Sequence, residues 1–166
     1  MLALRNGTLN RARTLQGLLV CGVALAASAA MAAASLSGAE AAKDRQAHMK
    51  EMGKAAKAIG AQLHDGKAEA AVVQPAAQVI ASHANELPHW FPKGSGKESG
   101  AKTHALALIW SEPADFAIKA KALQAAAPKL LAVAGTGDLA RVGPAMKEVG
   151  GTCKGCHEKF EEKHDD

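Results

Sequence analysis

Cys153-Lys154-Gly155-Cys156-His157 lies near the C-terminus of this 166-residue chain and decides how the rest of it is interpreted. Two thiols three positions apart face the same side of a helix, with their Cβ atoms about 5–6 Å apart. An imidazole follows the second thiol directly. This spacing suits two sulfurs that add to the vinyl groups of one porphyrin and a histidine that ligates its iron. We therefore expect one covalent haem c, held by Cys153 and Cys156, with His157 as an axial iron ligand.

Two other chemistries use cysteines at this spacing. A redox-active pair of the thioredoxin type usually precedes a helix within a βαβ unit, whereas this motif ends an alanine-rich helical pattern. A structural zinc site would need further ligands, and His157 and His164 are the nearest candidates. The position of the motif favours haem, and the zinc site stays open as a weaker alternative.

The composition indicates a small domain whose core contains few large side chains. Hydrophobic residues make up 48% of the chain but aromatic residues only 3%, tyrosine is absent, and alanine supplies much of the apolar content. Such a core has few bulky side chains, and a large flat ring would supply the missing volume. The length fits one domain. Because we recognise no nucleophile with a base, paired carboxylates or phosphate-binding loop, we expect no enzyme.

Residues 1–41 have the anatomy of an export signal. Three arginines among the first 13 residues form a basic start, residues 15–34 are uncharged and apolar, and small-residue sites follow at 30–32 and 39–41. We expect cleavage after about residue 32 or 41, a mature domain over residues 42–166, and a periplasmic location. An uncleaved membrane anchor is the alternative. Haem c is attached after export in bacteria, so the signal and the motif support each other.

Apolar residues recurring every three or four positions predict four helices. The stretches run over 43–63, over about 68–86, from Pro113 through Leu130, and from Leu139 through Phe160. Pro75 fits only the first turn of a helix, so the second helix would begin as late as Gln74. Pro128 and Pro144 are expected to kink or shorten their helices.

The connections between these helices are short except for residues 87–109, which are rich in proline and glycine and are expected to form a surface loop. Trp90, Phe91 and Trp110 would anchor its ends. We find no convincing strand alternation. The sequence therefore predicts an all-α fold, an antiparallel four-helix bundle with a covalently attached haem c.

Together these features resemble the class II c-type cytochromes, the group that contains cytochrome c prime. The resemblance covers about residues 43–163. Class I cytochromes usually carry the haem motif near the N-terminus, so its position here is discriminating. The residues that carry the resemblance are Arg45-Gln46, Met49-Lys50, Leu87-Pro88, Phe91-Pro92 before the glycine-rich loop, Ile109-Trp110 and the motif at 153–157.

The resemblance implies roles for two residues of the first helix. The side chain matching Met49 faces the haem opposite the histidine; in low-spin relatives it is a methionine that ligates iron, and in the high-spin type it is a nonpolar side chain, which can also be methionine. The residue matching Arg45 often lies near a haem propionate. We expect Met49 to be the sixth ligand, with packing as the alternative and Met52 as the next candidate. Glu161 departs from the family, in which the position four after the haem histidine is commonly basic.

The expected function is single-electron transfer by a periplasmic mono-haem protein, since methionine ligation would close the iron and raise its potential. The alternative is a high-spin, five-coordinate haem that binds nitric oxide or carbon monoxide. Redox proteins are the expected partners, gaseous ligands belong to the alternative, and a homodimer stays open. Without residues 1–41 the chain keeps 17 basic and 15 acidic residues, so we expect no nucleic acid.

The remaining histidines show no spacing that favours metal and are expected to be exposed or in loops; they are His48, His64, His83, His89, His104 and His164.

Overall fold

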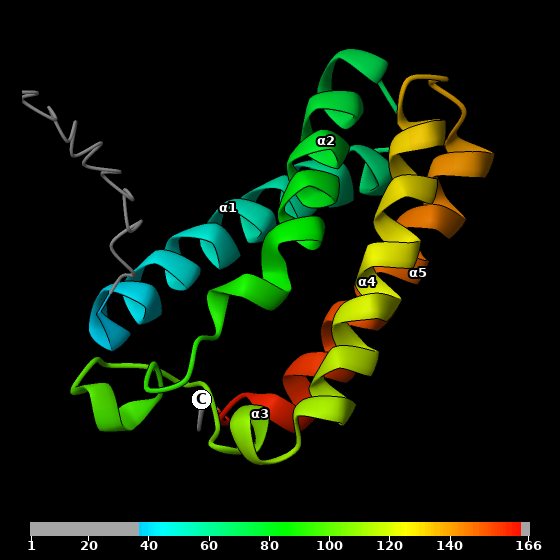
Figure 1. Cartoon of the computed structure of the whole chain (residues 1–166). Coiled ribbons are helices and arrows are strands. Elements are labelled where there is room, and N and C mark those ends of the chain that lie inside the picture. Colours follow the sequence, from blue (N-terminus) through cyan, green and yellow to red (C-terminus); the bar gives the residue numbers. More distant parts are fainter. Residues whose placement is uncertain (1–36, 164–166) are drawn as a thin grey trace, which may run out of the picture. The chain divides into compact units, whose positions relative to one another are not determined.

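The computed structural model describes residues 37–163 as a bundle of four long helices (Figure 1). They pack in the order α1, α2, α4, α5, and α5 also contacts α1. Apart from an isolated bridge between Ala105 and Glu161, the described residues contain no strand. The expected all-α four-helix bundle is thus confirmed. Its elements are α1 (Gly38–His64), α2 (Ala70–Glu86), η1 (Leu87–Trp90), η2 (Lys97–Ser99), α3 (Leu108–Ser111), α4 (Pro113–Ala134) and α5 (Leu139–Phe160).

Residues 1–36, which hold most of the expected export signal and its first cleavage site, lie outside the described residues, as does His164. The second expected cleavage site, at 39–41, falls within the first turn of α1. Ala41 and Ala42 are buried there. Of the helices in the described range, none combines the length and the apolar character needed to cross a membrane.

Helix α1 begins five residues earlier than its apolar spacing indicates, because Ser37 caps it. The Ser37 hydroxyl accepts a hydrogen bond from the Glu40 amide, and the Glu40 carboxylate accepts one from the Ser37 amide at 2.9 Å. These two bonds form a capping box, which satisfies amides that have no partner within the helix. They also hold the pKa of Glu40 below its usual value. The cap went unnoticed in the sequence because it lies in the expected signal segment.

Three prolines lie inside helices without ending them. Helix α2 begins at Ala70, so Pro75 is not in its first turn and the expected start near Gln74 is wrong. Pro128 in α4 and Pro144 in α5 are likewise internal. All three are exposed. A carbonyl that loses its amide partner to proline can therefore bond to water, which lowers the cost of the interruption.

The core is narrow along most of the bundle and aromatic at one end. Alanines with no exposed surface, such as Ala77 and Ala127, let the helices approach closely. Near the end of α5, Phe116 packs edge to face against Phe91 and Phe160, with ring centroids 4.8 and 5.4 Å apart. The few large rings thus gather beside the cysteine motif. The largest fully buried apolar side chains elsewhere are Ile59, Val73, Leu130, Val142 and Val149.

Candidate functional site

The last turns of α5 present the two cysteines of the motif as free thiols that pack against the hydrophobic core. Burial raises the pKa of Cys153, and burial next to Cys153 raises the pKa of Cys156 to about 11. A redox-active pair needs a thiolate, which depends on a lowered pKa. These thiols are protonated at neutral pH, so the site does not favour the thioredoxin-like alternative.

A cavity of about 420 Å³ opens between α1, the 87–109 connection and the end of α5. This volume falls within the range of cofactor sites, and its walls are mostly apolar or aromatic. Cys156 and His157 of the motif line it, whereas Cys153 lies one turn earlier against the core. The other lining residues are Arg45, Gln46, Met49, Lys50, Leu87, Phe91, Lys102, Thr103, His104, Ala105, Ile109, Phe116, Phe160 and Glu161.

Met49 reaches this cavity from α1, and His157 reaches it from α5. Met49 is partly buried against the core. Met52, one turn later on α1, is not among the lining residues. Two residues far apart in sequence therefore share one apolar space, as the resemblance implies for Met49. Whether Met49 ligates iron or only packs stays a prediction.

His157 pairs with Glu161, one turn further along α5. Nδ1 of His157 lies 2.9 Å from Oε2 of Glu161. A carboxylate only accepts hydrogen bonds, so Nδ1 carries the proton and donates it. That tautomer leaves the lone pair on Nε2, the nitrogen that can ligate a metal. Sequence reasoning noted Glu161 only as an exception to the family pattern and missed this contact.

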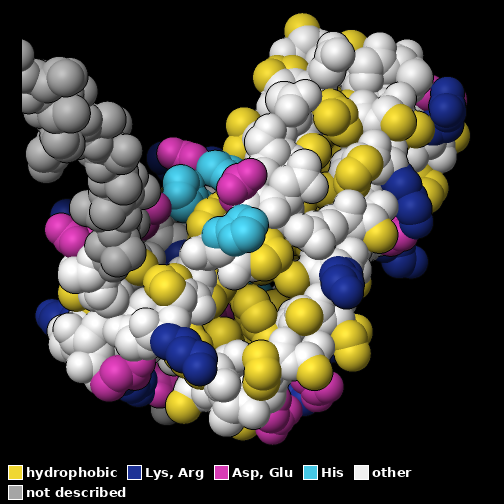
Figure 2. Space-filling model, in the orientation of Figure 1, with side chains coloured by type: hydrophobic (Ala, Val, Ile, Leu, Met, Phe, Trp, Pro, Cys, Tyr) yellow, Lys and Arg dark blue, Asp and Glu magenta, His cyan; other side chains and the backbone are white. Residues whose placement is uncertain are grey.

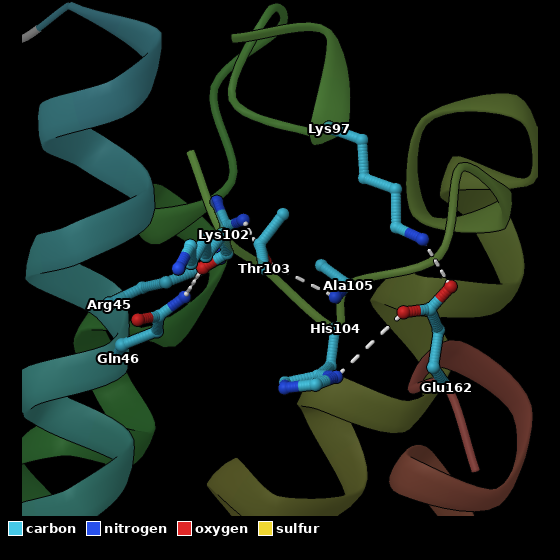
Figure 3. Close-up of polar contacts among 8 residues, drawn as sticks. All are labelled: Arg45, Gln46, Lys97, Lys102, Thr103, His104, Ala105 and Glu162. Carbon is cyan, nitrogen blue, oxygen red and sulfur yellow. Dashed lines mark hydrogen bonds and ion pairs between the residues drawn. The ribbon is translucent and has the colours of Figure 1, made fainter. Parts of the chain in front are cut away.

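Arg45 is buried, with 3% of its surface exposed, and its guanidinium binds the 87–109 connection (Figure 3). Nη1 donates to Ser95 Oγ at 2.9 Å, and Nη2 donates to Ser95 O at 2.7 Å and Thr103 Oγ1 at 2.9 Å. The guanidinium also lies 5.0 Å from the centre of the Phe91 ring. Desolvation lowers the pKa of Arg45 from its usual value. Arg45 lines the cavity, and its donors fix the loop. A contact with a haem propionate stays a prediction.

The same connection holds the end of α5 in place. Leu106 N donates to Phe160 O at 2.9 Å, and Glu162 N donates to His104 O at 2.8 Å. The Glu162 carboxylate pairs with Lys97 and His104, and Gln46 of α1 donates to the Lys102 carbonyl at 2.6 Å (Figure 3). The loop therefore joins α1 to the segment that carries His157 and Glu161.

The donor set fits a covalently attached haem. Two free thiols stand one helical turn apart, an imidazole keeps Nε2 available, and an apolar cavity adjoins them. Lys50 and Lys102 lie on the cavity lining, where positive charge would complement carboxylate groups. A zinc site would draw on His164, which lies outside the described residues.

Comparison with known proteins agrees with this geometry. A family model described as cytochrome c′ matches residues 40–161. Cytochrome c′ of Rhodospirillum rubrum is 40% identical over 104 residues, which cover 63% of this chain and 69% of that protein. Cytochrome c′ of Allochromatium vinosum is 36% identical over 154 residues, covering 92% of this chain and 97% of that protein.

Solved structures are similar over most of the bundle. Cytochrome c′ from Thermochromatium tepidum has a TM-score of 0.74 at 33% identity and covers 78% of this chain and all of its own. A cytochrome c′ with a ligand-controlled dimer dissociation has a TM-score of 0.72 at 35% identity, again covering 78% of this chain and all of its own. Cytochrome c prime from Alcaligenes xylosoxidans has a TM-score of 0.70 at 26% identity, covering 78% of this chain and 99% of its own. Structures of variants of that protein hold nitric oxide or carbon monoxide.

Proposed function

Because the chain belongs to the cytochrome c′ family, we propose that it is a haem c protein with an open iron site that binds nitric oxide or carbon monoxide. The observation that carries the proposal is the apolar cavity shared by Met49 and the Cys156-His157 pair. The gas-bound structures of the Alcaligenes relative support this function over the expected one, electron transfer by a methionine-ligated haem. The alternative stated from the sequence thus becomes the leading function.

In this proposal the two cysteines and the histidine of the motif have different roles. Cys153 and Cys156 fix the ring, which supplies the iron at which a diatomic gas binds. His157 would hold the iron through Nε2, and Glu161 keeps the imidazole in the required tautomer through Nδ1. The packing of both cysteines against the core limits how far the attachment points can move.

Met49 forms the opposite wall of the cavity in this proposal. Its thioether is flexible and apolar, so it excludes water and yields to a small ligand. Phe91 and Phe116 complete an aromatic side to the space and pack edge to face. With a haem in the cavity, these apolar walls would favour a small uncharged gas at the iron over a charged molecule.

Location and assembly are parts of the same proposal. Residues 1–32 direct export, so haem attachment takes place in the periplasm, where c-type haems are matured. The relative with a ligand-controlled dimer supports a homodimer for this chain as well. Redox proteins that reduce the iron are the expected protein partners.

The spectrum of the purified haem-loaded protein tests the proposal. A five-coordinate iron gives a high-spin spectrum in both oxidation states, and carbon monoxide added to the reduced protein shifts its main absorption band at once. A low-spin spectrum that resists carbon monoxide would instead indicate a closed iron and restore the electron-transfer function. Haem that is extracted by acid and acetone would contradict covalent attachment altogether.

A further inference from the structure

Helices α1 and α2 bring together three side chains that sequence spacing gave no reason to connect. A ring nitrogen of His48, a ring nitrogen of His83 and a carboxylate oxygen of Glu51 all lie within 4.8 Å of one another. Nε2 of His83 is 2.8 Å from Oε2 of Glu51. None of the three lines the haem cavity. Figure 2 shows histidine and acidic side chains grouped over this part of the molecule.

A further carboxylate lies beside this group, in contact with His48 alone among its members. Asp44 stands one turn before His48 on α1, and its Oδ2 lies 3.3 Å from Nε2 of His48. Asp44, His48 and Glu51 are spaced by four and three residues, so they share one stripe of the helix. Helix α1 thus supplies His48 and Glu51, with Asp44 beside His48, and α2 supplies His83 across the helix pair.

Trp90 of η1 holds the two imidazoles in position. Its indole is buried and stacks on His48 with ring centroids 4.6 Å apart, and it meets His83 edge to face at 5.5 Å. The two imidazoles are 4.9 Å apart. Rings fixed by packing lose less freedom when they bind a ligand, and this favours binding.

We propose that His48, Glu51 and His83 bind a divalent transition-metal ion of the zinc type. Two imidazoles with carboxylates are a common zinc ligand set, and imidazole also suits copper and nickel. Around zinc, bonds of about 2.0–2.1 Å place tetrahedral ligand atoms roughly 3.4 Å apart. The three ligand atoms, all within 4.8 Å of one another, lie close to this spacing, and the exposed Glu51 side chain can turn toward an ion between the two imidazoles.

A metal here would tie α1 to α2 beside η1. Helix α2 runs directly into η1, and Leu87 at the start of η1 and Phe91 directly after it line the haem cavity. The ion would therefore stabilise the folded bundle, because a ligand that binds only the folded state shifts the equilibrium toward it. The haem and its ligands are not required for this site.

Calorimetric titration of the haem-loaded, chelator-treated protein with zinc sulfate tests the proposal. We expect saturable binding of one zinc ion per chain. Replacing a ligand by His83→Asn or Glu51→Gln should weaken binding by at least about tenfold. His64→Asn is the matched control, since His64 is an exposed histidine at the end of α1, and it should bind zinc as the wild type does. The haem spectrum of each variant reports whether the bundle is intact.

Thermal unfolding with and without zinc gives a second measurement. Zinc should raise the unfolding temperature of the wild type and of His64→Asn but not that of Glu51→Gln. Because Glu51 is exposed, its substitution should not disturb the fold, so a lost zinc effect would reflect a lost ligand. The proposal is overturned if zinc does not bind saturably, or if Glu51→Gln and His83→Asn bind it as tightly as the wild type. In either case the group is a hydrogen-bonded surface cluster only.

Discussion

Nδ1 of His157 donates to Oε2 of Glu161 over 2.9 Å, one helical turn away at the end of α5. A carboxylate bonded to a ligating imidazole raises the basicity of that ligand. A more basic axial ligand favours the ferric over the ferrous ion, so with His157 as the proposed ligand the pair would link the Glu161 carboxylate to the potential of the iron. The backbone contacts of the 104–106 segment hold Glu161 close to His157.

Glu161→Gln should raise the reduction potential of the haem, because the amide keeps a hydrogen-bond acceptor but loses the negative charge. A tenfold change in the preference between the two oxidation states corresponds to about 59 mV for one electron, and second-sphere changes are typically of this order. Potentiometric titration measures the shift. Glu158→Gln is the control, because Glu158 pairs with Lys154 rather than with His157. Equal potentials in the wild type and Glu161→Gln would show that the pair has no electronic role.

Arg45→Met should destabilise the bundle by about 2–4 kcal/mol, since it leaves Ser95 and Thr103 with buried oxygens that have lost a charged donor. Arg45→Lys should cost less, because one ammonium keeps the charge but cannot reproduce the planar fork. Urea unfolding gives both values. Arg141→Met, an exposed change on α5, should be nearly neutral. A neutral Arg45→Met would mean that the loop does not depend on the guanidinium.

Cleavage of the export signal should occur after about residue 32 rather than residue 41. Cleavage at the later site would remove the Ser37–Glu40 capping box and the buried Ala41. Loss of a cap residue typically costs 0.5–2 kcal/mol, at about 1 kcal/mol on average. The intact mass of the periplasmic protein identifies its first residue, and Ser37→Ala measures the contribution of the cap. A mature chain that begins at Ala42 would show that the helix tolerates the loss.

Asp115 of α4 and Glu112, the N-cap residue of that helix, both pair with Lys159 of α5, next to the haem motif. The hydrogen bond and charge of Lys159 hold the pKa of Asp115 below its usual value of 3.8. The carboxylate therefore stabilises the fold above that pH, and the contribution disappears as pH falls through the lowered pKa. Urea midpoints should differ between the wild type and Asp115→Asn at neutral pH and converge as the pH falls through the lowered pKa. A difference that persists in acid would have another cause.

The cysteine motif and the four helices were predictable because both depend on local spacing. Apolar residues at helical intervals identified the stretches that became α1, α2, α4 and α5, and the expected starts at Pro113 and Leu139 are those of α4 and α5. The starts of two helices were less predictable. The Ser37 cap starts α1 before its apolar spacing begins, and because Pro75 is exposed, α2 can start before that proline. Local signals fix the type of an element better than its ends.

The contacts between distant residues were not predictable in this way. Arg45 was assigned to the haem side, but the loop that receives its hydrogen bonds lies 50 to 58 residues away. His48 and His83 have no sequence relationship until α1 and α2 pack against each other. The Glu161 contact lies within one helix, yet only the position of the side chain shows that it reaches Nδ1 rather than solvent.

Met49→Ala distinguishes the two roles that remain for Met49. If Met49 is a packing residue, the haem is already high-spin and Met49→Ala leaves the spin state unchanged. Removing the thioether should then speed carbon monoxide binding by about tenfold or more, which corresponds to a barrier lower by about 1.4 kcal/mol for each tenfold change. If Met49 ligates iron, the substitution instead converts a low-spin haem to a high-spin one and lowers its potential. Stopped-flow mixing of the reduced protein with carbon monoxide, together with the absorption spectrum, separates these outcomes.

Met52→Ala provides the control for that experiment, since Met52 has the same chemistry one turn along α1 but does not line the cavity. It should leave both the spectrum and the rate of carbon monoxide binding nearly unchanged. If Met49→Ala and Met52→Ala slow or speed the reaction equally, the effect comes from loosening of α1 as a whole. Met49 would then have no specific place in front of the iron, and the gas would reach the haem by a path that the cavity between α1 and α5 does not define.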